Sequence, residues 1–170
     1  MKPIYLIVAV DQDNGFSKDQ QIPWYLKEDL IHFRKVTTCA KPNHQNAVIM
    51  GRITYESMGS RTLSNRLNIV VSSTEQEGVL TVSSLYRAIL ECETNKTIES
   101  IFIIGGERLY REALDCFPIR GIYRTVVLAS FDCDRFFVPI HSSFQLIHET
   151  QHKENDLMFL IQTWAFREIK

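Results

Sequence analysis

Hydrophobic residues recur along the chain as short continuous runs that alternate with segments of helical spacing. The clearest runs are LIVAV near the N-terminus, AVIM from Ala47 and IFII from Ile101. Strands of a parallel sheet produce such runs because both of their faces are covered, whereas a half-exposed strand alternates apolar and polar residues. Helices between the runs provide the crossovers that parallel strands require. The pattern predicts an α/β protein with a mostly parallel central sheet and helices on both of its faces.

The predicted elements give a sheet of about eight strands. Extended segments are expected at Ile4–Val10, Ala47–Met50, Asn68–Val71, Leu80–Val82, Ile101–Ile104, Ile122–Leu128, Phe144–His148 and Met158–Phe166. Helices are expected at Tyr25–Thr37, at Arg52–Met58, after an N-cap at Ser83 or Ser84 with Leu85, Ile89 and Cys92 as the apolar face, and near Arg108–Leu114. With 170 residues and no linker or repeat, the chain is expected to form one domain, residues 1–170.

Composition narrows the classes of partner. The formal net charge is -1, so no broad basic surface is expected for nucleic acid or an anionic membrane. No apolar segment approaches the roughly 20 residues of a membrane span, and the first apolar run ends in Asp11 without a signal-peptide cleavage pattern. The four cysteines form no C-x-x-C pair and no metal-ligand spacing, so no metal is expected. They are expected to be free thiols in a reducing compartment, the cytoplasm.

Two strand ends carry similar glycine and arginine motifs. VIMGRITYES places Gly51 and Arg52 between a strand and a helix, and IFIIGGERLYREAL places Gly105, Gly106 and Arg108 in the same way. Glycine lets a phosphate approach the backbone, and a helix N-terminus with an arginine favours anions. Each motif alone also fits a tight turn with a solvated arginine. The two together favour a dinucleotide with several phosphates, although no G-x-G-x-x-G fingerprint is present.

An acidic residue faces inward on the first predicted helix. Helical spacing puts Leu26, Leu30 and Phe33 on one face, and Asp29 lies on that face. Glu28 points the other way, toward His32 and Lys35, and is expected to be a solvated charge. A buried carboxylate without a partner costs several kcal/mol or takes up a proton. The chain must therefore supply a partner for Asp29.

Three other residues have two interpretations each. Thr125 lies within an apolar strand and fits either a hydroxyl bonded to backbone or the partner of Asp29. Trp24 is the last residue of the long connection DQDNGFSKDQQIPW, which has the length of a functional lid. Its side chain could pack in the core or contact a ligand. Arg66 precedes a strand and, taken alone, fits a solvated residue at the edge of the sheet.

These motifs together resemble one known family, the dihydrofolate reductases. The resemblance runs from about Ile4 to Pro139, and its PW-x4-D and IMGR combinations are specific. The residues that carry it are Val8-Ala9-Val10, Asn14-Gly15, Ile22-Pro23-Trp24, Asp29, Phe33, Val48 to Arg52, Thr54, Arg66, Ser72-Ser73, Ile104-Gly105-Gly106, Tyr110, Thr125, Asp134, Phe136-Phe137 and Pro139. The resemblance implies a mostly parallel sheet with an antiparallel C-terminal strand. It also implies reduction of dihydrofolate to tetrahydrofolate with NADPH, by a hydride to C6 and a proton to N5 of the pterin.

The resemblance also implies roles for the substrate site. Asp29 would hold the pterin through N3–H and the 2-amino group, and Thr125 would bond to the Asp29 carboxylate. Leu30 and Phe33 would pack on the pterin and benzoyl rings, and Arg66 would pair with the α-carboxylate of the glutamate tail. The implied catalytic residues are Asp29, Trp24 and Thr125. The implied substrate-binding residues are Ile7, Val8, Asp29, Leu30, Phe33, Met58, Leu63, Arg66 and Ile104.

The implied cofactor site lies at the strand ends. Arg52 would contact the 2′-phosphate of NADPH, Gly105-Gly106 would be joined by a cis peptide, and the loop 15–21 would close over the nicotinamide beside Ile22 and Trp24. The implied cofactor-binding residues are Ala9, Asn14, Gly15, Phe16, Lys18, Ile22, Gly51, Arg52, Ile53, Thr54, Val71, Ser72, Ser73, Thr74, Gly105, Gly106, Glu107, Arg108, Leu109 and Tyr110. A monomer that also binds antifolates such as methotrexate is implied.

Some features depart from the family pattern, and two other functions remain open. Thr62 stands where the family often has proline, Glu107 follows the glycine pair where small residues are usual, and the last strand lacks an aromatic-x-Phe pattern. One alternative is a non-catalytic pterin- or NADPH-binding module on the same fold. Another is a reductase of related fold that acts on a flavin precursor, which would lack the PW-x4-D helix.

Overall fold

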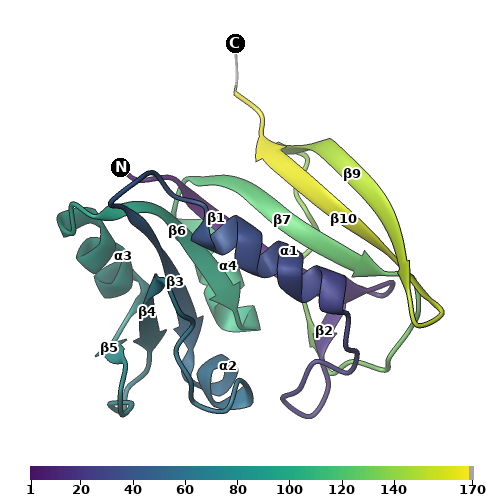
Figure 1. Cartoon of the computed structure of the whole chain (residues 1–170), viewed down its shortest axis with the longest axis horizontal. Helices are drawn as coiled ribbons and strands as arrows, with labels where there is room; N and C mark the ends of the chain where they lie inside the picture. The colour runs from purple at the N-terminus through teal and green to yellow at the C-terminus, as the bar shows by residue number, and fades with distance from the viewer. Residues whose placement is uncertain (169–170) are drawn as a thin grey trace.

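The predicted sheet is present, with its strands in the order β5-β4-β3-β6-β1-β7-β10-β9 (Figure 1). The computed structural model describes residues 1–168. Neighbouring strands are parallel from β5 to β7, and β10 pairs antiparallel with both β7 and β9. The strands of this sheet are β1 Ile4–Asp11, β3 Gln45–Gly51, β4 Arg66–Val71, β5 Leu80–Val82, β6 Ile98–Gly105, β7 Ile119–Val127, β9 Phe144–Glu154 and β10 Leu157–Phe166.

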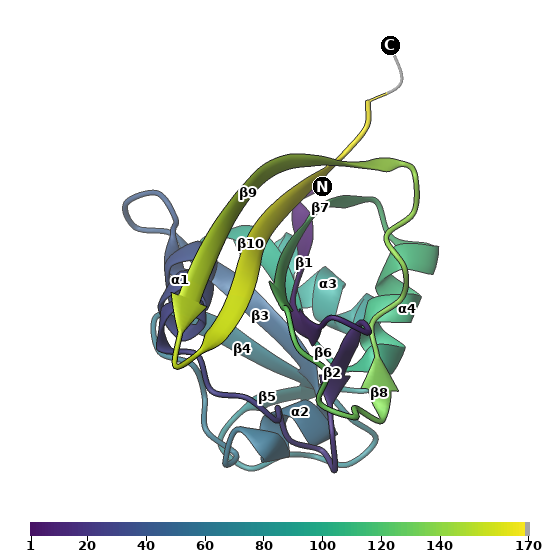
Figure 2. The same ribbon diagram turned by 90° about the vertical axis from the view of Figure 1, so that its right-hand side faces the viewer.

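Helices cover both faces of the sheet, as the continuous apolar runs predict (Figure 2). The helices α1 Lys27–Thr38 and α2 Arg52–Ser57 pack on one face, over a cluster that includes Ile7 and Phe102. The helices α3 Leu85–Thr94 and α4 Glu107–Cys116 pack on the other, over a larger cluster built from β1, β3, β4 and β6. The Ser84 hydroxyl accepts a hydrogen bond from the amide of Arg87, which confirms Ser84 as the N-cap of α3.

Several boundaries differ from the predicted ones. Helix α1 begins at Lys27, not Tyr25, because the backbone of Leu26 is extended and its side chain is buried in the core. Strand β4 begins at Arg66 instead of Asn68, and β9 runs to Glu154, well beyond His148. The residues that extend β9 are polar and pair with β10, and β4 begins at a polar residue, Arg66, that pairs with Asn46 of β3. Apolar periodicity does not detect such residues.

A small second sheet was not predicted. Within the long connection after β1, the segment β2 Gly15–Ser17 pairs antiparallel with β8 Arg135–Phe136. The partners lie far apart in the sequence, and strands of two or three residues have no periodicity to read. The pairing holds the first half of the connection against the body of the protein.

The carboxyl ends of the central strands lie side by side, and this alignment determines where a ligand can bind. Met50 of β3 is paired with Gly105 of β6, and Gly51 is paired with Val71 of β4. In open α/β sheets, ligands bind at this edge. No helix within residues 1–168 is long and apolar enough to cross a membrane.

Candidate active site

Asp29 and Thr125 form the central contact of the site. Asp29 is the third residue of α1, and Thr125 lies near the carboxyl end of β7 with 4% of its surface exposed. The Thr125 hydroxyl donates a hydrogen bond of 2.6 Å to Oδ1 of Asp29. Burial raises the pKa of Asp29 above its ordinary value, and the Thr125 hydrogen bond partly offsets that rise. The predicted partner of the inward carboxylate is therefore confirmed, and Oδ2, its second oxygen, accepts no hydrogen bond from the described residues.

Glu28 is exposed, as predicted, but it also has a partner that was not predicted. Its side chain is 54% exposed, but its carboxylate contacts Nδ1 of His152 on β9 at 2.9 Å, not His32 or Lys35. The contact comes from a distant strand, so helical spacing could not show it. Glu28 still points away from the apolar side of α1, so Asp29 is the carboxylate of this pair that is available to the site.

An apolar floor lies beside Asp29, between α1, α2 and the sheet. Five of the predicted substrate-binding residues belong to this one cluster: Ile7, Phe33, Met58, Leu63 and Ile104. Leu30 lies on α1 at the rim, with 50% of its surface exposed. Val8 packs into the cluster on the opposite face of the sheet, because successive side chains of a strand alternate. Only the backbone of Val8 can therefore face this floor.

Trp24 and Ala9 belong to a third cluster, near the end of β1. The Trp24 ring packs at 5.2 Å from the ring of Phe131, and the side chain is nearly buried. Ile22, two residues earlier, is 60% exposed. The structure thus places Trp24 in the core just before α1, with Ile22 on the surface beside it.

The two glycine motifs meet at the edge of the sheet. A methyl group added at Gly51 would lie 3.9 Å from the nitrogen of Gly106, and one added at Gly105 would lie 3.1 Å from Oγ1 of Thr54. The Gly105-Gly106 peptide is cis, as the family resemblance implies. The two motifs therefore form one cradle without side chains of their own, and the N-termini of α2 and α4 adjoin it.

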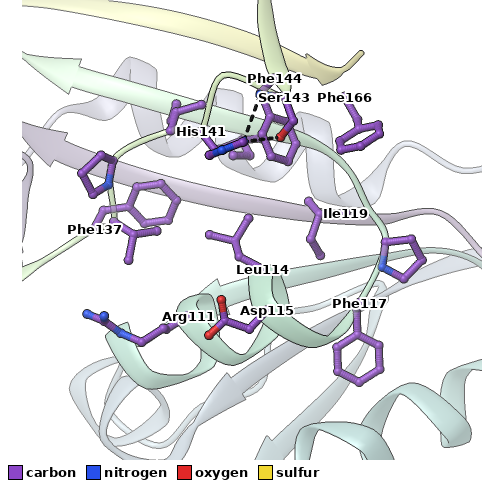
Figure 3. Close-up of a pocket in the computed structure, with 15 residues that line it drawn as sticks. Arg111, Leu114, Asp115, Phe117, Ile119, Phe137, His141, Ser143, Phe144 and Phe166 are labelled. Carbon is purple, nitrogen blue, oxygen red and sulfur yellow. Dashed lines mark hydrogen bonds between the residues drawn. The ribbon is translucent and has the colours of Figure 1, made fainter. Parts of the chain in front are cut away.

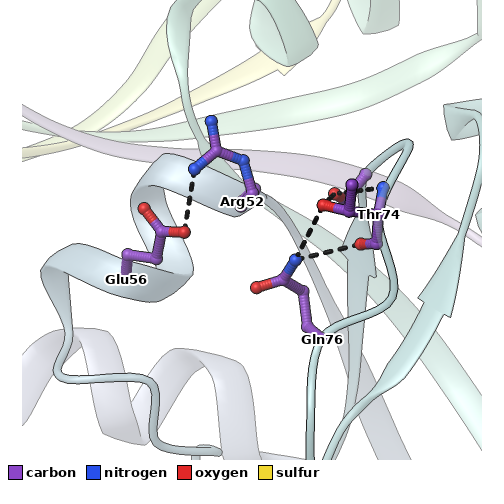
Figure 4. Close-up of polar contacts among 5 residues, drawn as sticks. Arg52, Glu56, Thr74 and Gln76 are labelled. Atoms are coloured by element: carbon purple, nitrogen blue, oxygen red, sulfur yellow. Dashed lines mark hydrogen bonds and ion pairs between the residues drawn. The ribbon is translucent and has the colours of Figure 1, made fainter.

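Arg52 is the first residue of α2, directly after Gly51, and Figure 4 shows it next to the turn that follows β4 and carries Thr74 and Gln76. Arg52 pairs with Glu56 at 2.8 Å, and both side chains are nearly half exposed. In the turn, the Ser72 hydroxyl accepts a hydrogen bond from the amide of Thr74. Val71 and Ser72 are half-buried, whereas Ile53, Ser73 and Thr74 are exposed. A surface arginine thus lies next to a turn rich in hydroxyl groups.

The predicted residues of α4 separate into two sets. Glu107 and Arg108 face the surface, and Glu107 approaches Arg111 at 3.4 Å. Leu109 and Tyr110 are buried, and the Tyr110 hydroxyl donates to the carbonyl oxygen of Ile7 at 2.8 Å. Tyr110 thus links α4 to β1 below the cradle.

The connection after β1 is anchored by Asp11, which sequence reasoning missed. Asp11 is 1% exposed, and its carboxylate accepts hydrogen bonds from the amides of Asp13, Gly15 and Phe131. The spacing of Asp11 to Asn14-Gly15 is typical of an aspartate that organises a turn, so the sequence does contain a pattern that predicts this role of Asp11. Phe16 packs on the core, while Lys18 is exposed.

Arg124 was also missed. Its Nη2 donates to Oδ1 of Asn14, and Asn14 is bonded to the carbonyl oxygen of Phe137. The Nε of Arg124 is buried and has no partner within residues 1–168. Arg124 thus joins β7 to the connection that carries Asn14 and Gly15.

Arg66 is buried, and its interpretation as a solvated edge residue is wrong. It is 9% exposed, its Nη1 donates to the Thr37 hydroxyl at 2.8 Å, and its Nε donates to the carbonyl of Ser64. Thr37 is on α1, so Arg66 lies where α1 crosses the start of β4. Within residues 1–168 the Arg66 guanidinium forms no ion pair, so its charge can pair with an anion from outside the protein.

A separate cavity of about 620 Å³ lies between α4 and the segment that leads into β9 (Figure 3). Its lining includes Leu114 of α4, Phe137, His141 and Phe144. None of the predicted site residues lines it. The candidate site is therefore the region around Asp29 and the glycine cradle.

The fold and the site define an α/β protein with a ligand site at the carboxyl ends of parallel strands. The dihydrofolate reductase family matches residues 3–165. The chain is 43% identical to dihydrofolate reductase from Schistosoma mansoni, over 79% of this chain and 77% of the relative, and 39% identical to the enzyme from Drosophila melanogaster, over 82% and 81%. It is also 34% identical to a bifunctional dihydrofolate reductase-thymidylate synthase from Glycine max, over 94% of this chain and 33% of the relative. The chain belongs to the dihydrofolate reductase family.

Proposed function

We propose that the protein reduces 7,8-dihydrofolate to 5,6,7,8-tetrahydrofolate with NADPH, and so supports thymidylate, purine and one-carbon metabolism. The observation that carries the proposal is the half-buried Asp29 carboxylate, which holds one hydrogen bond from Thr125 beside an apolar floor. A flat heterocycle with two adjacent NH groups fits such a place, because a carboxylate binds two parallel donors strongly and in one orientation.

Asp29 orients the pterin in this proposal. Its carboxylate accepts N3–H and the 2-amino group, while Phe33 and Leu30 contact the rings from α1. The raised pKa of Asp29 suits a group that takes part in proton chemistry. We propose that Asp29 favours protonation at N5 and that water delivers the proton. Arg66, held by Thr37, pairs with the glutamate α-carboxylate.

In this proposal, the cofactor binds at the glycine cradle. Gly51, Gly105 and Gly106 leave room for a pyrophosphate near two helix N-termini, and Ser72 and Thr74 present hydroxyl groups nearby. Arg52 supplies a positive charge for the 2′-phosphate, which distinguishes NADPH from NADH. NADPH, when bound there, supplies the hydride that reaches C6.

Further parts of the proposal concern the setting of the reaction. We propose that residues 1–170 act as one domain and as a monomer, and that antifolates such as methotrexate occupy the pterin site through Asp29. A cytoplasmic location fits the four cysteines, all of which are free.

One assay tests the function. The absorbance of NADPH is followed with the purified protein, with and without dihydrofolate. A decrease that requires dihydrofolate supports the proposal. Binding of either ligand without turnover would favour a non-catalytic binding module, and turnover with a flavin precursor but not dihydrofolate would favour the other reductase.

A further inference from the structure

Helix α1 has no N-terminal cap of its own within the described residues. Leu26 occupies the N-cap position, and its apolar side chain makes no cap hydrogen bond. The first backbone NH groups of a helix have no partner inside the helix, so a side chain or water must bind them. Asp29 lies in this first turn, so whatever binds these NH groups also fixes the backbone that carries Asp29.

A carboxylate from a distant strand supplies the cap. Oε1 of Glu154 accepts a hydrogen bond from the amide of Lys27 at 3.0 Å, and Oε2 accepts one from the amide of Glu28 at 3.2 Å. Glu154 is the last residue of β9, 127 positions after Lys27. Its negative charge also complements the positive end of the α1 dipole.

Glu154 belongs to a row of side chains on one face of β9. Thr150, His152 and Glu154 alternate along the strand and are the half-buried members of an otherwise exposed stretch. His152 contacts the Thr150 hydroxyl through Nε2 and Glu28 through Nδ1, and its ring stacks on Phe159. Figure 2 shows this end of β9 beside the start of α1.

The hairpin between β9 and β10 fixes the position of Glu154. Asn155 and Asp156 both have positive φ values, and Glu154 is paired directly with Leu157 across this two-residue turn. Turns of this kind set the register of the strands that they join. Through β10, the same hairpin is paired with the strand that carries Thr125, because Ile161 is paired with Thr125.

We propose that Glu154 is a positioning residue for Asp29. Glu154 accepts hydrogen bonds from two amides in the first turn of α1, while Thr125 donates one to the Asp29 side chain. Glu154 lies on β9 and Thr125 on β7, and β10 pairs with both of these strands. The proposal rests on the proposed function where it concerns dihydrofolate, and on the structure alone where it concerns the first turn of α1.

A double-mutant cycle with Glu154→Ala and Asp29→Asn, read as equilibrium binding of dihydrofolate, tests the proposal. Glu154→Ala should weaken binding by about two- to thirtyfold, the range of a lost helix cap. The same change should add little in the Asp29→Asn background, because the two residues act through one contact. Equal losses in both backgrounds would overturn the proposal, since a general structural defect adds independently.

Two further variants control this cycle. Glu154→Gln keeps one acceptor oxygen, so its loss of affinity should be smaller than that of Glu154→Ala. Glu149→Gln, on the same strand, keeps an acceptor for its contact with Gln162 and should bind dihydrofolate like the wild type. A Glu149→Gln variant as weak as Glu154→Ala would also overturn the proposal.

Hydrogen exchange separates this proposal from the proposed function. The amides of Lys27 and Glu28 should both exchange faster in Glu154→Ala than in the wild type, and at least one of them should exchange faster in Glu154→Gln, with no ligand present. Unchanged exchange would overturn the proposal even if the enzyme is active. Faster exchange in a protein that does not reduce dihydrofolate would support the cap and contradict the function alone.

Discussion

The Thr125 hydroxyl donates to the Asp29 carboxylate across 96 positions of sequence, at 2.6 Å. The hydrogen bond lowers the pKa of Asp29, whereas burial raises it by more. Thr125 therefore keeps Asp29 ionised to a lower pH than burial alone would allow. This balance gives the first prediction.

Thr125→Val removes the donor but keeps the shape of the side chain. Without the donor, the pKa of Asp29 should rise further, so the acidic limb of the pH–rate profile should move to higher pH. Thr125→Ser keeps the hydroxyl and should leave that limb in place. The profile of kcat/KM measures both variants. A Thr125→Val profile that coincides with the wild-type profile would show that the hydroxyl does not tune Asp29.

Arg52→Ala should weaken NADPH binding and leave NADH binding nearly unchanged. The expected loss is about 1.5–3 kcal/mol, the scale of a hydrogen bond to a charged group. Glu56→Gln is the matched control, because it removes the carboxylate that pairs with Arg52 at 2.8 Å. This variant should bind NADPH more tightly than the wild type. Titrations with both cofactors measure these effects. Equal losses for NADPH and NADH would mean that Arg52 does not read the 2′-phosphate.

Arg66→Ala should raise the KM for dihydrofolate by about 10- to 100-fold, because it removes a hydrogen bond between charged groups. A pterin without the glutamate tail should be unaffected. Because Arg66 also donates to Thr37, the variant should lose some thermal stability. Thr37→Val removes that acceptor but keeps the charge, so its KM should rise less. Similar KM increases for both pterins would assign Arg66 a structural role.

Gly15→Ala should disturb the connection after β1. An added methyl carbon would lie 2.3 Å from Cβ of Cys133, a distance that no packed pair tolerates. The expected cost is about 1–3 kcal/mol of unfolding free energy, as for other overpacked sites. Cys133→Gly removes the obstructing atoms, and the double variant should regain most of the stability. Thermal unfolding measures the series, and a double variant no more stable than Gly15→Ala would contradict this packing.

Much of the fold could be predicted from local pattern. The runs at Ile4, Ala47 and Ile101 are apolar on both faces because helices cover both faces of the sheet. Each run taken alone therefore indicates a strand of a parallel sheet. The inward direction of Asp29 could be predicted from its position one helical turn before Phe33, which packs on the apolar floor. The two glycine motifs could be expected to meet, because adjacent parallel strands end at one edge.

The remaining features depend on pairs of residues that are distant in sequence. The burial of Arg66 depends on Thr37, the contact of Glu28 on His152, and the second sheet on a partner that follows β7. Each of these segments looks polar and exposed when taken alone. Tertiary contacts, which no local period encodes, decide them.

The most direct test is the pH profile of hydride transfer for the wild type, Asp29→Asn and Glu28→Gln. Asp29→Asn cannot accept both NH groups of the pterin or hold a negative charge. It should lose about 10²–10⁴-fold in rate at neutral pH, the range of positioned proton transfer. It should regain part of this as pH falls, because dihydrofolate then arrives already protonated from solvent. Glu28→Gln should stay close to the wild type. An Asp29→Asn enzyme with normal activity at neutral pH, or a Glu28→Gln enzyme with the larger loss, would contradict the role assigned to Asp29.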